Sequence, residues 1–105
     1  MGKNVLIICE TGISAALLVS KTLEEVQAQS LNLEVDYAQT SKLAKKLDQE
    51  DYDVFILTPQ VFSKKDKISK ILEDKDVNGS IIEMTSEEIE FMNVGSLLRR
   101  VNETE

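Results

Sequence analysis

Four short apolar runs, each followed by a longer segment whose apolar residues recur every three or four positions, constrain the fold of this chain more than any other feature. The apolar runs span residues 4–8, 33–37, 53–57 and 80–84. The segments with helical spacing span residues 14–29, 41–50, 63–73 and 94–102. Strands that alternate with helices in this manner build a parallel sheet covered by helices on both faces. The pattern therefore predicts a single α/β domain over residues 1–105.

The composition of the apolar runs predicts their order in the sheet. Residues 4–8 and 53–57 are almost continuously apolar, which is typical of strands buried on both faces. Residues 33–37 alternate apolar and acidic side chains, as expected of a strand at an edge. With right-handed crossover connections, the four-stranded order 2-1-3-4 follows most simply. Such an open sheet binds ligands at the carboxyl ends of its strands where the order reverses, so we expect the functional site in residues 9–16 and 58–61.

The charged and metal-binding residues exclude several classes of function. The chain has 105 residues, of which 19 are acidic and 12 are basic, giving a net charge of −7. This charge repels the phosphate backbone of nucleic acids, so we expect no nucleic-acid partner. The chain contains no histidine and one cysteine, which removes internal disulfides, Ser-His-Asp triads and the usual zinc sites. We therefore expect no metal site.

The sequence also lacks the usual signals for membranes and export. It holds no window of about 18 apolar residues, so the chain is not expected to span a membrane. The first apolar run is too short to be the core of a signal peptide. These observations predict a cytoplasmic location.

The connection after the first apolar run holds the residues best suited to chemistry. It reads Cys9, Glu10, Thr11, Gly12, Ile13, Ser14, Ala15 and Ala16. Gly12 permits a tight turn, and the unpaired N–H groups at the start of the following helix form a cradle for an anion. The same donors stabilise a thiolate, so Cys9 is a candidate nucleophile for a phosphocysteine intermediate. A small buried residue without a chemical role is the competing interpretation of Cys9.

The loop and its neighbours resemble a known family. Residues 9–19 are similar to the active-site loop of the lactose/cellobiose type of enzyme IIB in the bacterial sugar phosphotransferase system, which runs Cys-x-x-Gly-x-Ser followed by small residues and Leu-Leu-Val. The motif Pro59-Gln60-Val61 follows the third apolar run, as in that family. The motif Met92-Asn93 precedes the last helix, where the family also has it. The spacing of strands and helices agrees over nearly the whole chain.

This resemblance implies a fold and a mechanism. The fold is a single-domain open parallel sheet with a phosphatase-like active-site loop after its first strand. A phosphohistidine on a IIA partner protein would donate its phosphoryl group to Cys9. Phospho-Cys9 would pass the group to a sugar, such as the β-linked disaccharides cellobiose and lactose, bound by the membrane transporter IIC. Residues 10–16 would bind the phosphoryl group, flanked by Thr58, Pro59 and Gln60, and no cofactor is needed because phosphohistidine is already an activated donor.

Glu10 departs from the family pattern, in which a small or hydroxyl residue stands at this position. A carboxylate about 6 Å from a thiolate, at an effective dielectric of about 40, opposes the thiolate by about 1.4 kcal/mol. The helix N-terminus contributes roughly 0.3–2 kcal/mol in the other direction. An inward Glu10 would therefore cancel much of the activation of Cys9, whereas an outward one is a contact for a basic partner or a solvated loop charge. We favour the solvated charge.

A local group of lysines stands out against the acidic composition. It comprises Lys64, Lys65, Lys67 and Lys70, within and just before the third helical segment. A docking site for an acidic partner and a solvated helix face are both compatible with this group, and we favour the solvated face.

Other families with a related fold fit the sequence less well. Low-molecular-weight tyrosine phosphatases and arsenate reductases need an arginine six residues after the cysteine, where this chain has Ala15. Response-regulator receivers need an aspartate at the end of the third strand, where Thr58 stands. A flavodoxin-like module that binds phosphate or FMN remains the alternative, because residues 11–14 resemble a flavodoxin phosphate loop. The absence of tryptophan, which would stack on a flavin ring, weighs against it.

Overall fold

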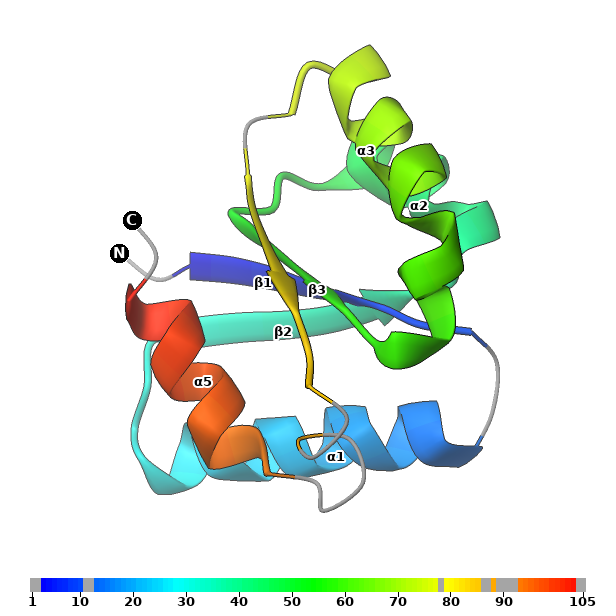
Figure 1. Ribbon diagram of the computed structural model, residues 1–105. Coiled ribbons are helices and arrows are strands. Elements are labelled where there is room, and N and C mark those ends of the chain that lie inside the picture. Colours follow the sequence, from blue (N-terminus) through cyan, green and yellow to red (C-terminus); the bar gives the residue numbers. More distant parts are fainter. Residues whose placement is uncertain (1–2, 11–12, 78, 86–87, 89–92, 104–105) are drawn as a thin grey trace.

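Strands and helices alternate along the chain in the predicted manner (Figure 1). The computed structural model describes residues 3–10, 13–77, 79–85, 88 and 93–103. Its strands are β1 (Lys3–Ile8), β2 (Leu33–Ala38), β3 (Val54–Leu57) and β4 (Ser80–Glu83). Its α-helices are α1 (Ile13–Ala28), α2 (Leu43–Gln49), α3 (Lys65–Asp74) and α5 (Val94–Glu103).

The described strands form one parallel sheet in the order β2-β1-β3-β4, which confirms the predicted topology. β1 lies between β2 and β3, so that Ile8 is opposite both Ala38 and Leu57. β3 is buried throughout, whereas the edge strand β2 is mostly half-buried or exposed. α1 and α5 cover one face of the sheet, and α2 and α3 cover the other (Figure 1).

Successive side chains of the central strands enter opposite cores. Within the described part of the chain, Val5 and Ile7 of β1 join the core beneath α1 and α5, whereas Leu6 and Ile8 join the core beneath α2 and α3. Each fully buried side chain of this size stabilises the fold by roughly 1.5–3 kcal/mol. The carboxyl end of β1 is therefore held rigidly from both faces of the sheet.

The helices after β2 and β3 begin differently from the prediction. The spacing predicts helices over 41–50 and 63–73, but short 3-10 helices, Thr40–Lys42 and Pro59–Lys64, lead into α2 and α3. In the second case, Pro59 stands in the first turn, where its fixed φ and missing N–H are tolerated. A 3-10 turn is tighter than the α-helix that follows it, and periodicity alone does not distinguish the two.

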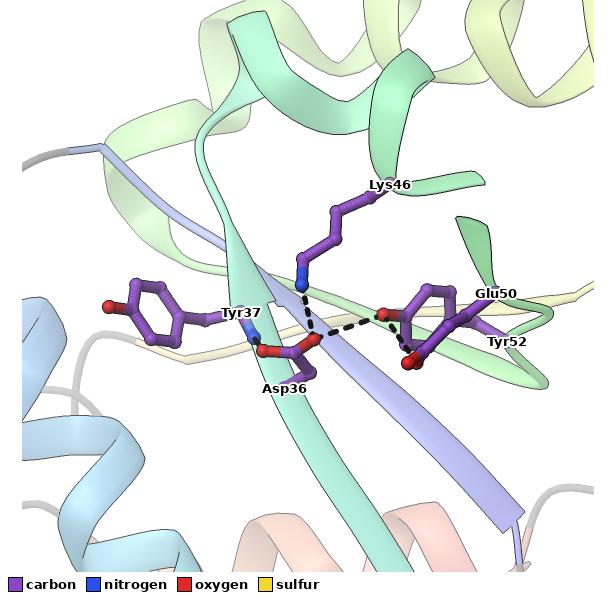
Figure 2. A network of polar contacts seen from close by, with 5 residues as sticks. All are labelled: Asp36, Tyr37, Lys46, Glu50 and Tyr52. Atoms are coloured by element: carbon purple, nitrogen blue, oxygen red, sulfur yellow. Dashed lines mark hydrogen bonds and ion pairs between the residues drawn. The ribbon is translucent and has the colours of Figure 1, made fainter. Parts of the chain in front are cut away.

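A network of polar contacts fastens the edge strand β2 to the segment that leads into β3 (Figure 2). Lys46 Nζ lies 2.5 Å from Asp36 Oδ2, and the Tyr52 hydroxyl lies 3.1 Å from the same oxygen. The Tyr52 hydroxyl is also 3.2 Å from Glu50 Oε2, and the N–H of Tyr37 donates to Asp36 Oδ1 at 2.8 Å. Partial burial raises the pKa of Asp36, but the hydrogen bonds, led by that from Lys46, outweigh burial and hold this pKa below its ordinary value.

We expect Asp36→Asn to lower the stability of the protein at neutral pH, because it removes the charge that Lys46 and Tyr52 contact. A carboxyl group whose pKa is lowered by folding contributes stability above its unfolded pKa and loses this contribution as the pH falls through the folded pKa. The loss should be about 1 kcal/mol near neutral pH and should shrink below about pH 4. Urea unfolding across this pH range measures it, with Asp74→Asn at an exposed position of α3 as the control. A loss that stays constant at acidic pH would contradict the assignment.

Gly79, directly before β4, lies against the side chain of Phe55. A Cβ atom at this position would come within 2.9 Å of Phe55 Cδ2 and 3.2 Å of the carbonyl oxygen of Asp53. Phe55 is fully buried, so its ring cannot shift without disturbing the core. We expect Gly79→Ala to lower the free energy of unfolding by roughly 1–3 kcal/mol, as measured by urea denaturation.

Gly95 of α5 provides the matched control for this substitution. Its added Cβ would meet Glu25 Oε1 at 3.7 Å, an ordinary contact distance, and the position is helical. Gly95→Ala should therefore raise the free energy of unfolding by about 0.5–1 kcal/mol. Similar losses in both variants would show that close approach to Phe55 is not the cause.

Candidate functional site

The carboxyl ends of β1, β2 and β3 bring the two predicted site loops side by side. The N–H of Cys9 donates to the carbonyl oxygen of Ala38 at 3.0 Å, and the N–H of Thr58 donates to that of Ile8 at 3.3 Å. The Thr58 hydroxyl, which is buried, also donates to Ile8 O at 3.1 Å. Strand pairing thus continues one residue past the strand ends and fixes Cys9 relative to Thr58.

Cys9 is the buried nucleophile candidate at this edge, with 1% of its surface exposed. Burial raises the pKa of its thiol, and the carboxylate of Glu10 raises it further. The thiol is therefore protonated at neutral pH. The predicted thiolate character is wrong for this state of the protein, because the lost hydration of a charged sulfur and the nearby negative charge both favour the neutral form.

Helix α1 begins at Ile13, and its N-terminus lies on the same side of the molecule as the end of β1 (Figure 1). The first-turn N–H groups of an α-helix have no partner within the helix, and together with the helix dipole they attract anions. Thr11 and Gly12 lie outside the described residues, as do the side chains of residues 13–15. The side chain of Ala16 is exposed. The role of this loop as a phosphate cradle stays a prediction.

The second predicted loop, residues 58–61, overlaps the start of the 3-10 helix Pro59–Lys64. The side chains of Pro59 and Gln60 lie outside the described part of the chain, so the expectation that they flank the phosphoryl group stays a prediction. Val61 is fully buried in the core beneath α2 and α3. In the motif before the last helix, Met92 is also outside the described residues, and the N–H of Asn93 donates to the carbonyl oxygen of Glu88 at 2.9 Å.

Glu10, in the loop after β1, contacts the loops that follow β2 and β3 at the carboxyl edge of the sheet. Its Oε1 accepts a hydrogen bond from Thr40 Oγ1 at 3.0 Å and another from Lys64 Nζ at 2.9 Å, the latter within an ion pair. Thr40 follows β2, and Lys64 ends the 3-10 helix that follows β3. The expectation of a solvated loop charge is therefore wrong: the carboxylate is about one-third exposed and held by two neighbouring loops.

These contacts also change the interpretation of the lysine group. The hydrogen bond from Lys64, and then that from Thr40, holds the pKa of Glu10 below its ordinary value. Lys65, the next residue, pairs with Glu83 of β4. Two members of the predicted solvated face are thus engaged in ion pairs that cross between elements.

Sequence reasoning missed Thr40 and Lys64 as members of the site. They lie 30 and 54 positions from Glu10 in the chain, so no local motif connects the three residues. The predicted strand order was the available signal, because it places the connections after the first, second and third strands at one edge of the sheet.

The arrangement combines a candidate nucleophile with charged groups of both signs. A protonated thiol, a helix N-terminus and a carboxylate–ammonium pair lie at one edge. Among the described residues, no group of three His, Cys, Asp or Glu side chains is placed to hold a metal ion. In the same part of the chain, no helix has the length and apolar character needed to cross a membrane.

Among the solved structures that share this fold are two IIB components. The solution structure of the cellobiose-specific phosphotransferase IIB component from Borrelia burgdorferi has a TM-score of 0.72 and 22% identity, covering 94% of this chain and 87% of the other. The lactose-specific IIB component domain of the phosphoenolpyruvate:carbohydrate phosphotransferase system from Streptococcus pneumoniae has a TM-score of 0.77 and 19% identity, covering 98% and 97%. At these identities the structures establish the fold alone.

The sequence itself identifies the family. No curated protein sequence matches the chain significantly. The family model described as "PTS system, Lactose/Cellobiose specific IIB subunit" matches residues 4–90, which include both predicted site loops. Because this match covers most of the chain, the protein belongs to the lactose/cellobiose-specific IIB subunit family of the sugar phosphotransferase system.

Proposed function

We propose that this protein is a phosphoryl carrier in which Cys9 accepts a phosphoryl group from a phosphohistidine of a IIA partner. Phospho-Cys9 then passes the group to a sugar bound by the membrane transporter IIC, the sugar being a β-linked disaccharide such as cellobiose or lactose. The observation that carries this proposal is the place of Cys9 in a chain of the IIB family, directly after β1 and four residues before α1 begins at Ile13.

The transfer needs no reactant other than this protein and the phosphorylated IIA partner. The sulfur of Cys9 attacks the phosphorus, so an S–P bond forms as the P–N bond of the phosphohistidine breaks. The thiol proton goes to the imidazole nitrogen that leaves. A thiol that keeps its proton until the donor arrives therefore supplies what the leaving group needs, which fits the raised pKa of Cys9.

The proposed cradle acts by electrostatics. In it, the N–H groups of the first turn of α1 hold the equatorial oxygens of the phosphoryl group in line for transfer. The chain works in the cytoplasm and reaches the inner face of the membrane through IIC. Membership of the IIB family favours this role over the flavodoxin-like alternative.

The central prediction concerns the acceptor atom. Incubation with a phosphorylated IIA protein of the lactose/cellobiose type should add the mass of one phosphoryl group to this chain, and Cys9→Ser should abolish the gain. Intact-protein mass spectrometry measures the gain, and an unchanged circular dichroism spectrum of the variant confirms its fold. Persistence of the gain in Cys9→Ser would show that another residue is the acceptor, and no gain in the wild type with any IIA would overturn the proposed function.

A second prediction concerns Glu10. Its carboxylate raises the pKa of the Cys9 thiol, so Glu10→Ser should lower that pKa. The Cβ chemical shift of Cys9, followed by NMR over a pH titration, reports the change directly on the buried sulfur. Glu24→Ser, which removes an exposed carboxylate from α1, serves as the matched control and should leave the midpoint unchanged. If the pH midpoint of the Cys9 titration does not fall in Glu10→Ser, the carboxylate of Glu10 does not raise the pKa of the thiol.

A further inference from the structure

A phosphoryl group on Cys9 would meet unfavourable electrostatics. A phosphate monoester carries a charge of about −1.5 to −2 at neutral pH. Glu10 is the next residue in the chain, and its negative charge already reaches the sulfur, since it raises the pKa of the thiol. The whole chain has a net charge of −7. A cation close to Cys9 would therefore stabilise the phosphorylated state beyond what the N–H groups of α1 contribute.

Several described cations have ionic partners elsewhere in the fold. Arg100 Nη1 lies 2.7 Å from Glu88 Oε1, and Glu88 is almost fully buried. Three lysines pair with carboxylates away from this loop, namely Lys46 with Asp36, Lys65 with Glu83 and Lys75 with Asp48. These pairs tie secondary structure elements together, and breaking them would carry a cost in stability.

Lys64 has the place and the freedom that the phosphorylated state requires. Its Nζ lies 2.9 Å from Glu10 Oε1, so the ammonium group is already at the loop that carries Cys9. Its side chain is 45% exposed, and its ammonium group is carried on a flexible four-carbon stem, so the group can move without opening the core. Glu10 also accepts a hydrogen bond from Thr40, which can hold the carboxylate when the ammonium leaves.

We propose that Lys64 is a phosphoryl-binding residue and that Glu10 is its counterion in the resting state. This proposal rests on the proposed function of Cys9 as phosphoryl carrier. When the phosphoryl group arrives on Cys9, its oxygens take the Lys64 ammonium from Glu10, while Thr40 keeps Glu10 in place. Lys67 of α3, whose charge also acts on Glu10, is the nearby cation that then faces the released carboxylate.

Inorganic phosphate tests this proposal on the isolated protein, without IIA or IIC. Phosphate titrations at constant ionic strength, followed by the amide NMR signals of the loop after β1, give the dissociation constant. Lys64→Met should weaken phosphate binding by roughly two- to fivefold, the range for a partly exposed ion pair. Glu10→Gln should strengthen binding by a similar factor, because it removes the competing carboxylate. Lys65→Met, which removes the neighbouring ammonium paired with Glu83, should bind phosphate as the wild type does.

The opposite signs of the two effects separate this role from a structural one. Lys64→Met and Glu10→Gln both break the same ion pair, so a purely structural pair would give losses in both variants. Losses in both, equal affinities of Lys64→Met and Lys65→Met, or no phosphate binding by the wild type would each overturn the proposal.

The phosphorylated protein provides the second measurement. With phosphorylated IIA as donor, the fraction of Cys9 that carries a phosphoryl group at equilibrium should fall in Lys64→Met and stay unchanged in Lys65→Met. A wild type that gains no phosphoryl group overturns the proposed function, whereas a wild type that gains it equally with Lys64→Met overturns only the role of Lys64.

Discussion

The pairing of β1 with a parallel strand on each side is the interaction on which the rest of the structure depends. It places Ile8 opposite both Ala38 and Leu57, so three strands end at one level. Parallel strands need crossover helices, and these helices cover both faces and close the two cores. The loop after β1 therefore starts from a rigid base, and residues far apart in sequence meet there. This register brings Thr40 and Lys64 within reach of Glu10.

Much of the fold could be predicted from the sequence because buried positions recur with a period typical of each element, and apolar residues occupy them. The continuous apolar runs marked the central strands, and the alternation of apolar and acidic residues after Leu33 marked the edge. The strand order then followed from handedness, and it placed the loops after β1 and β3 at the same edge of the sheet. Membership of the family was also readable, since the residues around Cys9 carry a spaced motif.

What could not be predicted depends on contacts between loops and on the depth of burial. The partners of Glu10 come from two other connections, and side-chain reach across a sheet edge leaves no trace in local periodicity. The direction of the thiol pKa shift needed the exposed fraction of Cys9, because the helix N-terminus and desolvation act in opposite directions. The tight fit of Gly79 against Phe55 likewise appears only once the strands are packed.

The burial of Cys9 has a consequence for oxidative damage. Oxidants attack the thiolate, and attack by a small peroxide requires access to the sulfur. The sulfur of Cys9 is protonated rather than a thiolate, and a residue that is only 1% exposed gives a peroxide little access. The chain contains no second cysteine with which a sulfenic acid could form an internal disulfide, so an oxidised Cys9 has no route to repair within the molecule. Burial therefore protects the single cysteine of the chain from this kind of oxidation.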